Sequence, residues 1–199
     1  MLRETTLPLE GQVYGPAAEN GLLYYLVINM TFNKYKKSVD SGLAGEKRFD
    51  KIAEARGCAV MEASKRDNMI RKIDRYVIDE NGILKSVDVK IMKRTSRSDA
   101  SAQDKWIWVE FNNVNGNDGW LYGEADYIAF ERKNNFTLVN RKELVKIAEE
   151  LVDLEARVSS SKLARYKAYR RYGRSDLIAM MELDKIISMA KDFEIWYKE

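Results

Sequence analysis

Two hydrophobic patterns divide the chain between residues 39 and 131. Apolar side chains over residues 39–56 recur at helical spacing, Phe49 and Ile52 among them, and Gly57 then stops the helix. The segments that follow are short and rich in apolar residues, as strands are. They are residues 58–63, two strands within 73–94 around the turn at 79–82, residues 105–114, and residues 125–131.

The two ends of the chain carry different patterns. The apolar run at 22–29 predicts a further strand, whereas residues 1–29 as a whole form an extension to which the sequence assigns no role. From Asn140 onward the pattern is helical, with an apolar stripe that includes Leu144, Ile147 and Leu151. Residues 177–199 predict a terminal helix.

This order of elements predicts an α+β fold with one mixed or antiparallel sheet of four or five strands. The expected organisation is an extension at 1–29, an α+β core at 30–139, and a helical, basic C-terminal region at 140–199 packed on that core.

The amino-acid composition excludes several kinds of catalysis and metal site. The chain has 199 residues, one cysteine (Cys58) and no histidine, which excludes Ser-His-Asp and Cys-His catalysis and a Cys/His zinc site. A metal ion would need oxygen ligands, which favours Mg²⁺, Mn²⁺ or Ca²⁺. A single cysteine and the lack of a long apolar span predict a soluble, cytoplasmic protein with no membrane partner.

Three residues of the central strands could act on a phosphate ester. Asp88 and Lys90 are two apart on a strand, so both side chains point to one face. Asp74 begins the preceding strand, and a hairpin around Asn81-Gly82 would bring it near Asp88. Two carboxylates can hold a divalent cation, and a lysine can orient water or stabilise charge on a phosphate.

Asp74, then thirteen intervening residues, then Asp88-Val89-Lys90 resembles the D…(D/E)xK signature of the PD-(D/E)xK nuclease superfamily, which includes restriction endonucleases and Holliday-junction resolvases. The resemblance spans roughly residues 40–131, with Ile73 in place of the proline. It implies a restriction-endonuclease-like core, and its first helix often supplies another acidic residue, which Glu46 matches.

Glu110 leaves a second register open. Asp88 could be the first acid and Glu110 the acid of the next motif strand, with Asn112 where the lysine belongs. Glu110 could instead be an additional ligand of the first register. A third interpretation gives these residues no chemistry, because acidic and basic side chains on a solvated sheet face also form cross-strand ion pairs.

A basic cluster near the C-terminus points to nucleic acid, although the net charge is only +3. Tyrosines are interleaved with it, and at helical spacing several basic side chains share one face. A solvated helix face is the simpler alternative. The predicted contacts to nucleic acid are Lys167, Arg170, Arg171 and Arg174.

Two further positions have paired interpretations. Trp120 ends a glycine-rich stretch and either contacts nucleic acid or packs on the core, and packing is favoured. Asp126 either supports the site from behind or is an exposed strand acid, and exposure is favoured.

The resemblance thus implies an Mg²⁺-dependent endonuclease, with Mn²⁺ as a substitute, that hydrolyses phosphodiesters in DNA. Asp74 and Asp88 would bind the metal with help from Glu46 and Glu110, and Lys90 would position the attacking water. Duplex cleavage would suit a homodimer. The alternatives are an inert nuclease fold that binds nucleic acid or a protein, and a phage-type structural protein whose basic segment contacts a partner.

Overall fold

The computed structural model describes residues 36, 39–96 and 98–198. The chain divides into two compact units, residues 1–41 and residues 42–199. The extension at 1–29 and the strand expected at 22–29 lie outside the described residues. The fold described below is that of the second unit.

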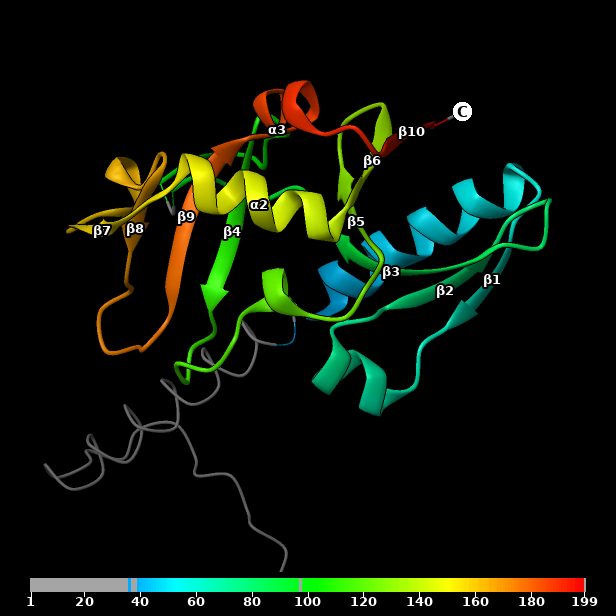
Figure 1. The fold of residues 1–199 in the computed structure, drawn as a ribbon, viewed down its shortest axis with the longest axis horizontal. Helices are drawn as coiled ribbons and strands as arrows, with labels where there is room; N and C mark the ends of the chain where they lie inside the picture. The colour runs from blue at the N-terminus through cyan, green and yellow to red at the C-terminus, as the bar shows by residue number, and fades with distance from the viewer. Residues whose placement is uncertain (1–35, 37–38, 97, 199) are drawn as a thin grey trace, which may run out of the picture. The chain divides into compact units, whose positions relative to one another are not determined.

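The first helix covers residues 39–55, close to the predicted range, and all but its first three residues belong to this unit. Phe49 and Ala53 are fully buried and share an apolar cluster with Val77, Val87 and residues of neighbouring strands. This stripe holds the helix against one face of a sheet (Figure 1).

The larger sheet has six strands, and its order is mostly that of the sequence. Neighbours are antiparallel except β3 and β5, which are parallel. In spatial order the strands are β1 (Ala59–Glu62), β2 (Arg75–Ile78), β3 (Leu84–Lys90), β5 (Tyr127–Glu131), β6 (Asn135–Asn140) and β10 (Phe193–Tyr197). The predicted strands of the motif region are confirmed.

A second sheet of four strands takes up β4, which the sequence pattern placed in the first sheet. β7 and β8 are parallel, and the other neighbours are antiparallel. Its spatial order is β4 (Trp106–Asn112), β9 (Leu177–Glu182), β8 (Lys167–Tyr169) and β7 (Asp153–Val158). The α+β class is therefore confirmed, but the prediction of a single sheet is wrong.

Helices are few. α2 (Arg141–Leu151) is capped by Asn140, whose side chain accepts hydrogen bonds from two backbone amides of the first turn, and α3 is Leu183–Met189. Leu144 of α2 is fully buried in a core shared with strands of both sheets, so this helix packs where the sheets meet (Figure 1). Short turns lie at η1 (Asp67–Arg71), η2 (Trp120–Tyr122) and η3 (Ser161–Leu163). None of the helices in the described part of the chain is long and apolar enough to cross a membrane.

The prediction of a helical C-terminal region at 140–199 is wrong for most of that range. Only α2 and α3 are α-helices there, and residues 153–182 form β7, β8 and β9. A buried strand such as LIAMME at 177–182 has no alternation, so its pattern does not differ from that of a buried helix. β9 pairs with β4, and β10 pairs with β6. Strands from the expected core at 30–139 and from the expected C-terminal region at 140–199 therefore lie side by side in both sheets.

Candidate active site

The two faces of β3 have different surroundings. Val87 and Val89 pack into the apolar cluster beneath the first helix. The alternating residues Ser86, Asp88 and Lys90 therefore face the opposite side of the sheet, as the sequence pattern predicts. Asp88 and Lys90 share one face because they are two residues apart.

Asp88 is a buried carboxylate with an unused oxygen. Its exposed fraction is 2%, and Lys90 Nζ donates to its Oδ1 at 2.5 Å. Its Oδ2 is buried and receives no hydrogen bond from a donor among the described residues, while the Asp74 carboxylate lies close enough to share a proton with the Asp88 carboxyl. Burial raises the pKa of Asp88 to about 7, the positive charge of Lys90 opposes this shift, and the negative charge of Asp74 adds to it.

Asp74 lies where β2 and β3 separate. β2 pairs with β3 only as far as Val87, and the Asp74 amide donates to the Val87 carbonyl at 2.9 Å. Beyond that point Asp74 Oδ2 accepts from the Val89 amide at 2.8 Å. The carboxylate thus takes the place of a strand carbonyl at the edge of β3, within electrostatic range of Asp88.

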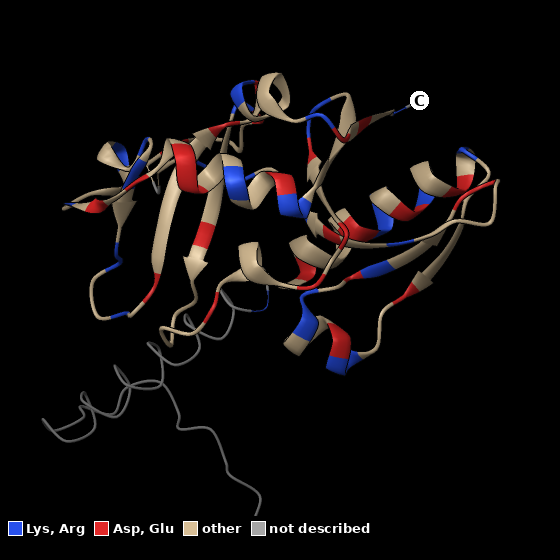
Figure 2. Cartoon of the chain, viewed as in Figure 1, with Lys and Arg blue, Asp and Glu red and all other residues tan. Residues whose placement is uncertain are grey.

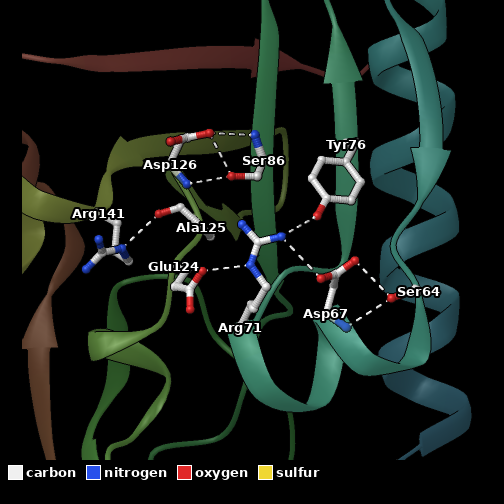
Figure 3. A network of polar contacts seen from close by, with 9 residues as sticks. All are labelled: Ser64, Asp67, Arg71, Tyr76, Ser86, Glu124, Ala125, Asp126 and Arg141. Carbon is white, nitrogen blue, oxygen red and sulfur yellow. Dashed lines mark hydrogen bonds and ion pairs between the residues drawn. The ribbon is translucent and has the colours of Figure 1, made fainter.

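Asn68 holds the other Asp74 oxygen. Its Nδ2 donates to Asp74 Oδ1 at 2.5 Å from the short turn η1. A polar network fixes that turn (Figure 3): Arg71 donates to Asp67 at 3.2 Å, to Tyr76 at 3.1 Å and to Glu124 at 2.7 Å. Asn68 was not predicted, since no local motif relates it to Asp74.

Figure 3 also shows Asp126, which the sequence left between two roles. Its Oδ2 accepts from the amide and the hydroxyl of Ser86 at 2.9 and 2.7 Å. The residue is exposed, and these bonds join the start of β5 to β3. Asp126 is thus an exposed acid with a structural bond to the strand that carries Asp88.

Glu46 reaches the site through an arginine. Arg75, which is 5% exposed, donates to Glu46 at 3.0 Å, to Asp50 at 2.7 Å and to the Asp74 carbonyl at 2.9 Å. Burial raises the pKa of Glu46, and the charge of Asp74 contributes next. The structure therefore brings Glu46 next to Asp74, with its charge balanced by Arg75.

Glu110 approaches from the other sheet. β4 pairs with β9, while the parallel neighbour of β3 is β5, so the two motif strands of the second register lie in different sheets. Burial raises the pKa of Glu110, and the positive charges of Lys90 and Arg171 oppose the shift. Glu110 thus lies within electrostatic range of Lys90.

The aromatic ring of Trp120 lies beside Lys90. Its Nζ lies 5.0 Å from the ring centroid of Trp120, which is 8% exposed and packs edge-on against Phe130. The core-packing interpretation of Trp120 is confirmed. Lys90 also lines a cavity of about 30 Å³, large enough for a water molecule, together with Trp106 and Trp120.

The predicted helical face of basic residues does not exist. Lys167 lies on β8, and Arg170, Arg171 and Arg174 lie in the loop between β8 and β9, where basic segments show in blue in Figure 2. Tyr166 has φ of 55°, which an α-helix cannot contain. Three of the four predicted contacts nevertheless remain together on one loop.

The described residues contain no cluster of three or more Asp, Glu, Cys or His side chains placed to hold a metal ion. Of the oxygen ligands that the sequence predicts, Asp74 and Asp88 lie within electrostatic range of each other, Glu46 within range of Asp74, and Glu110 within range of Lys90. Comparison of the chain with protein-family models, curated proteins and solved structures finds no match.

Proposed function

We propose that the protein is a metal-dependent nuclease that hydrolyses phosphodiester bonds in DNA. One observation carries the proposal: Asp88 is buried, has an oxygen that receives no hydrogen bond from a donor among the described residues, and lies beside both Asp74 and Lys90. Burying a carboxylate with an unsatisfied oxygen is costly, so such groups are typical of sites that bind a ligand.

The residues present fit a hard divalent cation. Asp74 and Asp88 would hold Mg²⁺ or Mn²⁺ through carboxylate oxygens, and a cation would satisfy the free oxygen of Asp88. Mg²⁺ usually keeps several waters and takes only one or two protein carboxylates, so a pair of acids is enough. The bound ion would lower the pKa of a water molecule and neutralise charge on the phosphate.

Lys90 is the positively charged residue that contacts Asp88 directly, and the charge of Lys93 acts on the same group. The Lys90 ammonium is held between Asp88 Oδ1 and the Trp120 ring, so it is positioned before the substrate arrives. There it orients the water that attacks phosphorus and stabilises the negative charge that grows on the phosphate as the bond to the leaving oxygen breaks. Glu46 and Glu110 adjust the local charge from either side.

A second candidate is an inert protein of the same fold that binds nucleic acid or a protein. Two observations favour it: Lys90 already forms an ion pair with Asp88, and the described residues offer no group of three acidic ligands. Such a protein would bind DNA equally well with and without a divalent metal, and would not cut it.

Cleavage separates the two candidates. Supercoiled plasmid, linear duplex, single-stranded DNA and branched DNA are incubated with the full chain in Mg²⁺, in Mn²⁺ and in EDTA. The nuclease proposal predicts products in Mg²⁺ or Mn²⁺ and none in EDTA. DNA binding with no product on any substrate in either metal would favour the inert protein instead.

A further inference from the structure

The loop between β8 and β9 presents an aromatic side chain to solvent. Tyr172 has an exposed fraction of 104%, the highest among the large apolar side chains that are exposed in the described part of the chain. Arg170 and Arg174 stand on either side of it and are exposed as well. A fully exposed tyrosine between arginines gains nothing from the core, so its position is not explained by packing.

The loop is nevertheless held in place. Asp176 is completely buried, accepts from the Arg171 amide at 3.0 Å and forms an ion pair with the Arg171 guanidinium. The Arg174 amide donates to the Arg171 carbonyl at 3.1 Å, which closes a turn around Tyr172 in which Gly173 has φ of 70°. Arg171 is thus a structural anchor, and Tyr172 is carried at the tip of a defined turn.

The same loop is joined to the strand that carries Glu110. The Ser175 amide donates to the Val114 carbonyl at 3.2 Å, just past the end of β4. In the pairing of β4 with β9, Glu110 lies opposite Ile178, close to the point where the loop enters β9. The charge of Arg171 acts on Glu110 together with that of Lys90, so the arginine that anchors the loop lies within electrostatic range of Glu110.

Building on the proposed nuclease function, we propose that this loop binds an unpaired nucleotide of the DNA substrate. Tyr172 would stack on the exposed base, and Arg170 and Arg174 would contact the phosphates on either side. A base inside a duplex already has stacking neighbours on both faces, whereas an unpaired base offers a free face to the tyrosine. The substrate class is therefore single-stranded DNA or DNA with unpaired bases.

The test measures binding without cleavage. Fluorescence anisotropy in EDTA follows the full chain binding to a single-stranded oligonucleotide and to a blunt duplex of the same length. We expect Tyr172→Ala to weaken binding to the single strand by about tenfold and to change duplex binding little, while Tyr172→Phe keeps the affinity of the parent. Tyr197→Ala, which removes another exposed tyrosine, is the matched control and should have no effect.

The inference is overturned if Tyr172→Ala binds the single strand as well as the parent does, if it loses duplex binding equally, or if the parent binds no single strand. Because metal is absent, these outcomes are independent of catalysis. If the protein cleaves DNA but lacks this binding pattern, only the inference about the loop is wrong. If it has the binding pattern but cleaves no DNA, only the nuclease proposal is wrong.

Discussion

Asp88 illustrates what burial does to a single carboxylate. Its pKa is raised from 3.8 to about 7, so between about pH 4 and pH 7 the folded protein binds more protons than the unfolded chain. The free energy of unfolding therefore falls as pH rises through this window. Above pH 7 the folded protein carries the whole cost of the buried charge.

Removing that charge should stabilise the protein. At pH 8 we expect Asp88→Asn to raise the free energy of unfolding by on the order of 1–3 kcal/mol, and at pH 4 the difference should vanish. Urea denaturation at both values measures it. Asp184→Asn, at an exposed residue paired with Arg132, is the control and should shift neither curve by much. A variant that is no more stable than the parent at pH 8 would contradict the burial argument.

Metal binding should raise the thermal stability of the folded protein. A ligand that binds only the folded protein stabilises it by about 2.7 kcal/mol at a hundred times its dissociation constant. Saturating Mg²⁺ or Mn²⁺ should thus raise the melting temperature of the parent measured by calorimetry, and should leave Asp88→Asn nearly unchanged. Equal shifts in the two proteins would place the metal elsewhere.

Gly119 allows the chain before η2 to pack closely against the backbone of β4. The Gly119 amide donates to the Phe111 carbonyl at 2.8 Å, and a Cβ on Gly119 would lie 2.1 Å from the Glu110 carbonyl oxygen. Because backbone would have to move, Gly119→Ala should destabilise the protein by about 1–3 kcal/mol or more and displace the neighbouring Trp120. Thermal unfolding measures the loss.

Gly42 offers the matched control for that substitution. It lies in the first helix, and a Cβ there meets none of the described residues within 4 Å. Gly42→Ala should therefore stabilise the helix by up to about 1 kcal/mol, since alanine restricts the unfolded chain and favours helix. If both alanine variants lowered the melting temperature alike, the close contact at Gly119 would not be the cause.

The elements that sequence predicts well are those with local signals. The β2–β3 hairpin follows from its turn: Asp79 Oδ1 accepts from the Asn81 and Ile83 amides at 3.0 Å each, and Gly82 has φ of 79°. The face shared by Asp88 and Lys90 follows from strand alternation. Both predictions needed only residues a few positions apart.

What sequence does not predict depends on contacts between distant segments. The assignment of β4 to a second sheet rests on its pairing with β9, about seventy residues later. Asn68 meets Asp74 because η1 is fixed by Arg71 and Glu124, and the Lys90–Trp120 contact joins β3 to η2. Periodicity carries no information on such pairings, and a left-handed residue such as Tyr166 breaks a helix that the pattern favours.

At the scale of the whole molecule, the positive charge that could attract DNA lies on particular side chains and not in the net charge. The net charge of +3 is modest, so attraction to DNA should come from particular side chains. If Arg170 and Arg174 each contact one phosphate of a single strand, replacing both with alanine should reduce the slope of log affinity against log salt by roughly 1.4. Anisotropy titrations over a range of NaCl concentrations measure that slope.

Two lysines of α2 provide the control for the salt experiment. Lys142 and Lys146 are exposed on a helix that is distant in sequence from the loop, and replacing both with alanine removes the same charge from the protein. A slope that falls equally in both double variants would show that net charge, not the β8–β9 loop, attracts DNA.

The central claim is that Asp88 and Lys90 form the catalytic centre of a nuclease. The most direct measurement is the rate at which supercoiled plasmid is nicked in Mg²⁺ by the parent, Asp88→Asn, Lys90→Ala and the control Asp184→Asn. We predict that the first two variants lose activity by about a hundredfold or more while still binding DNA, and that the control keeps the parent rate. Nicking at the parent rate by Asp88→Asn would contradict the account.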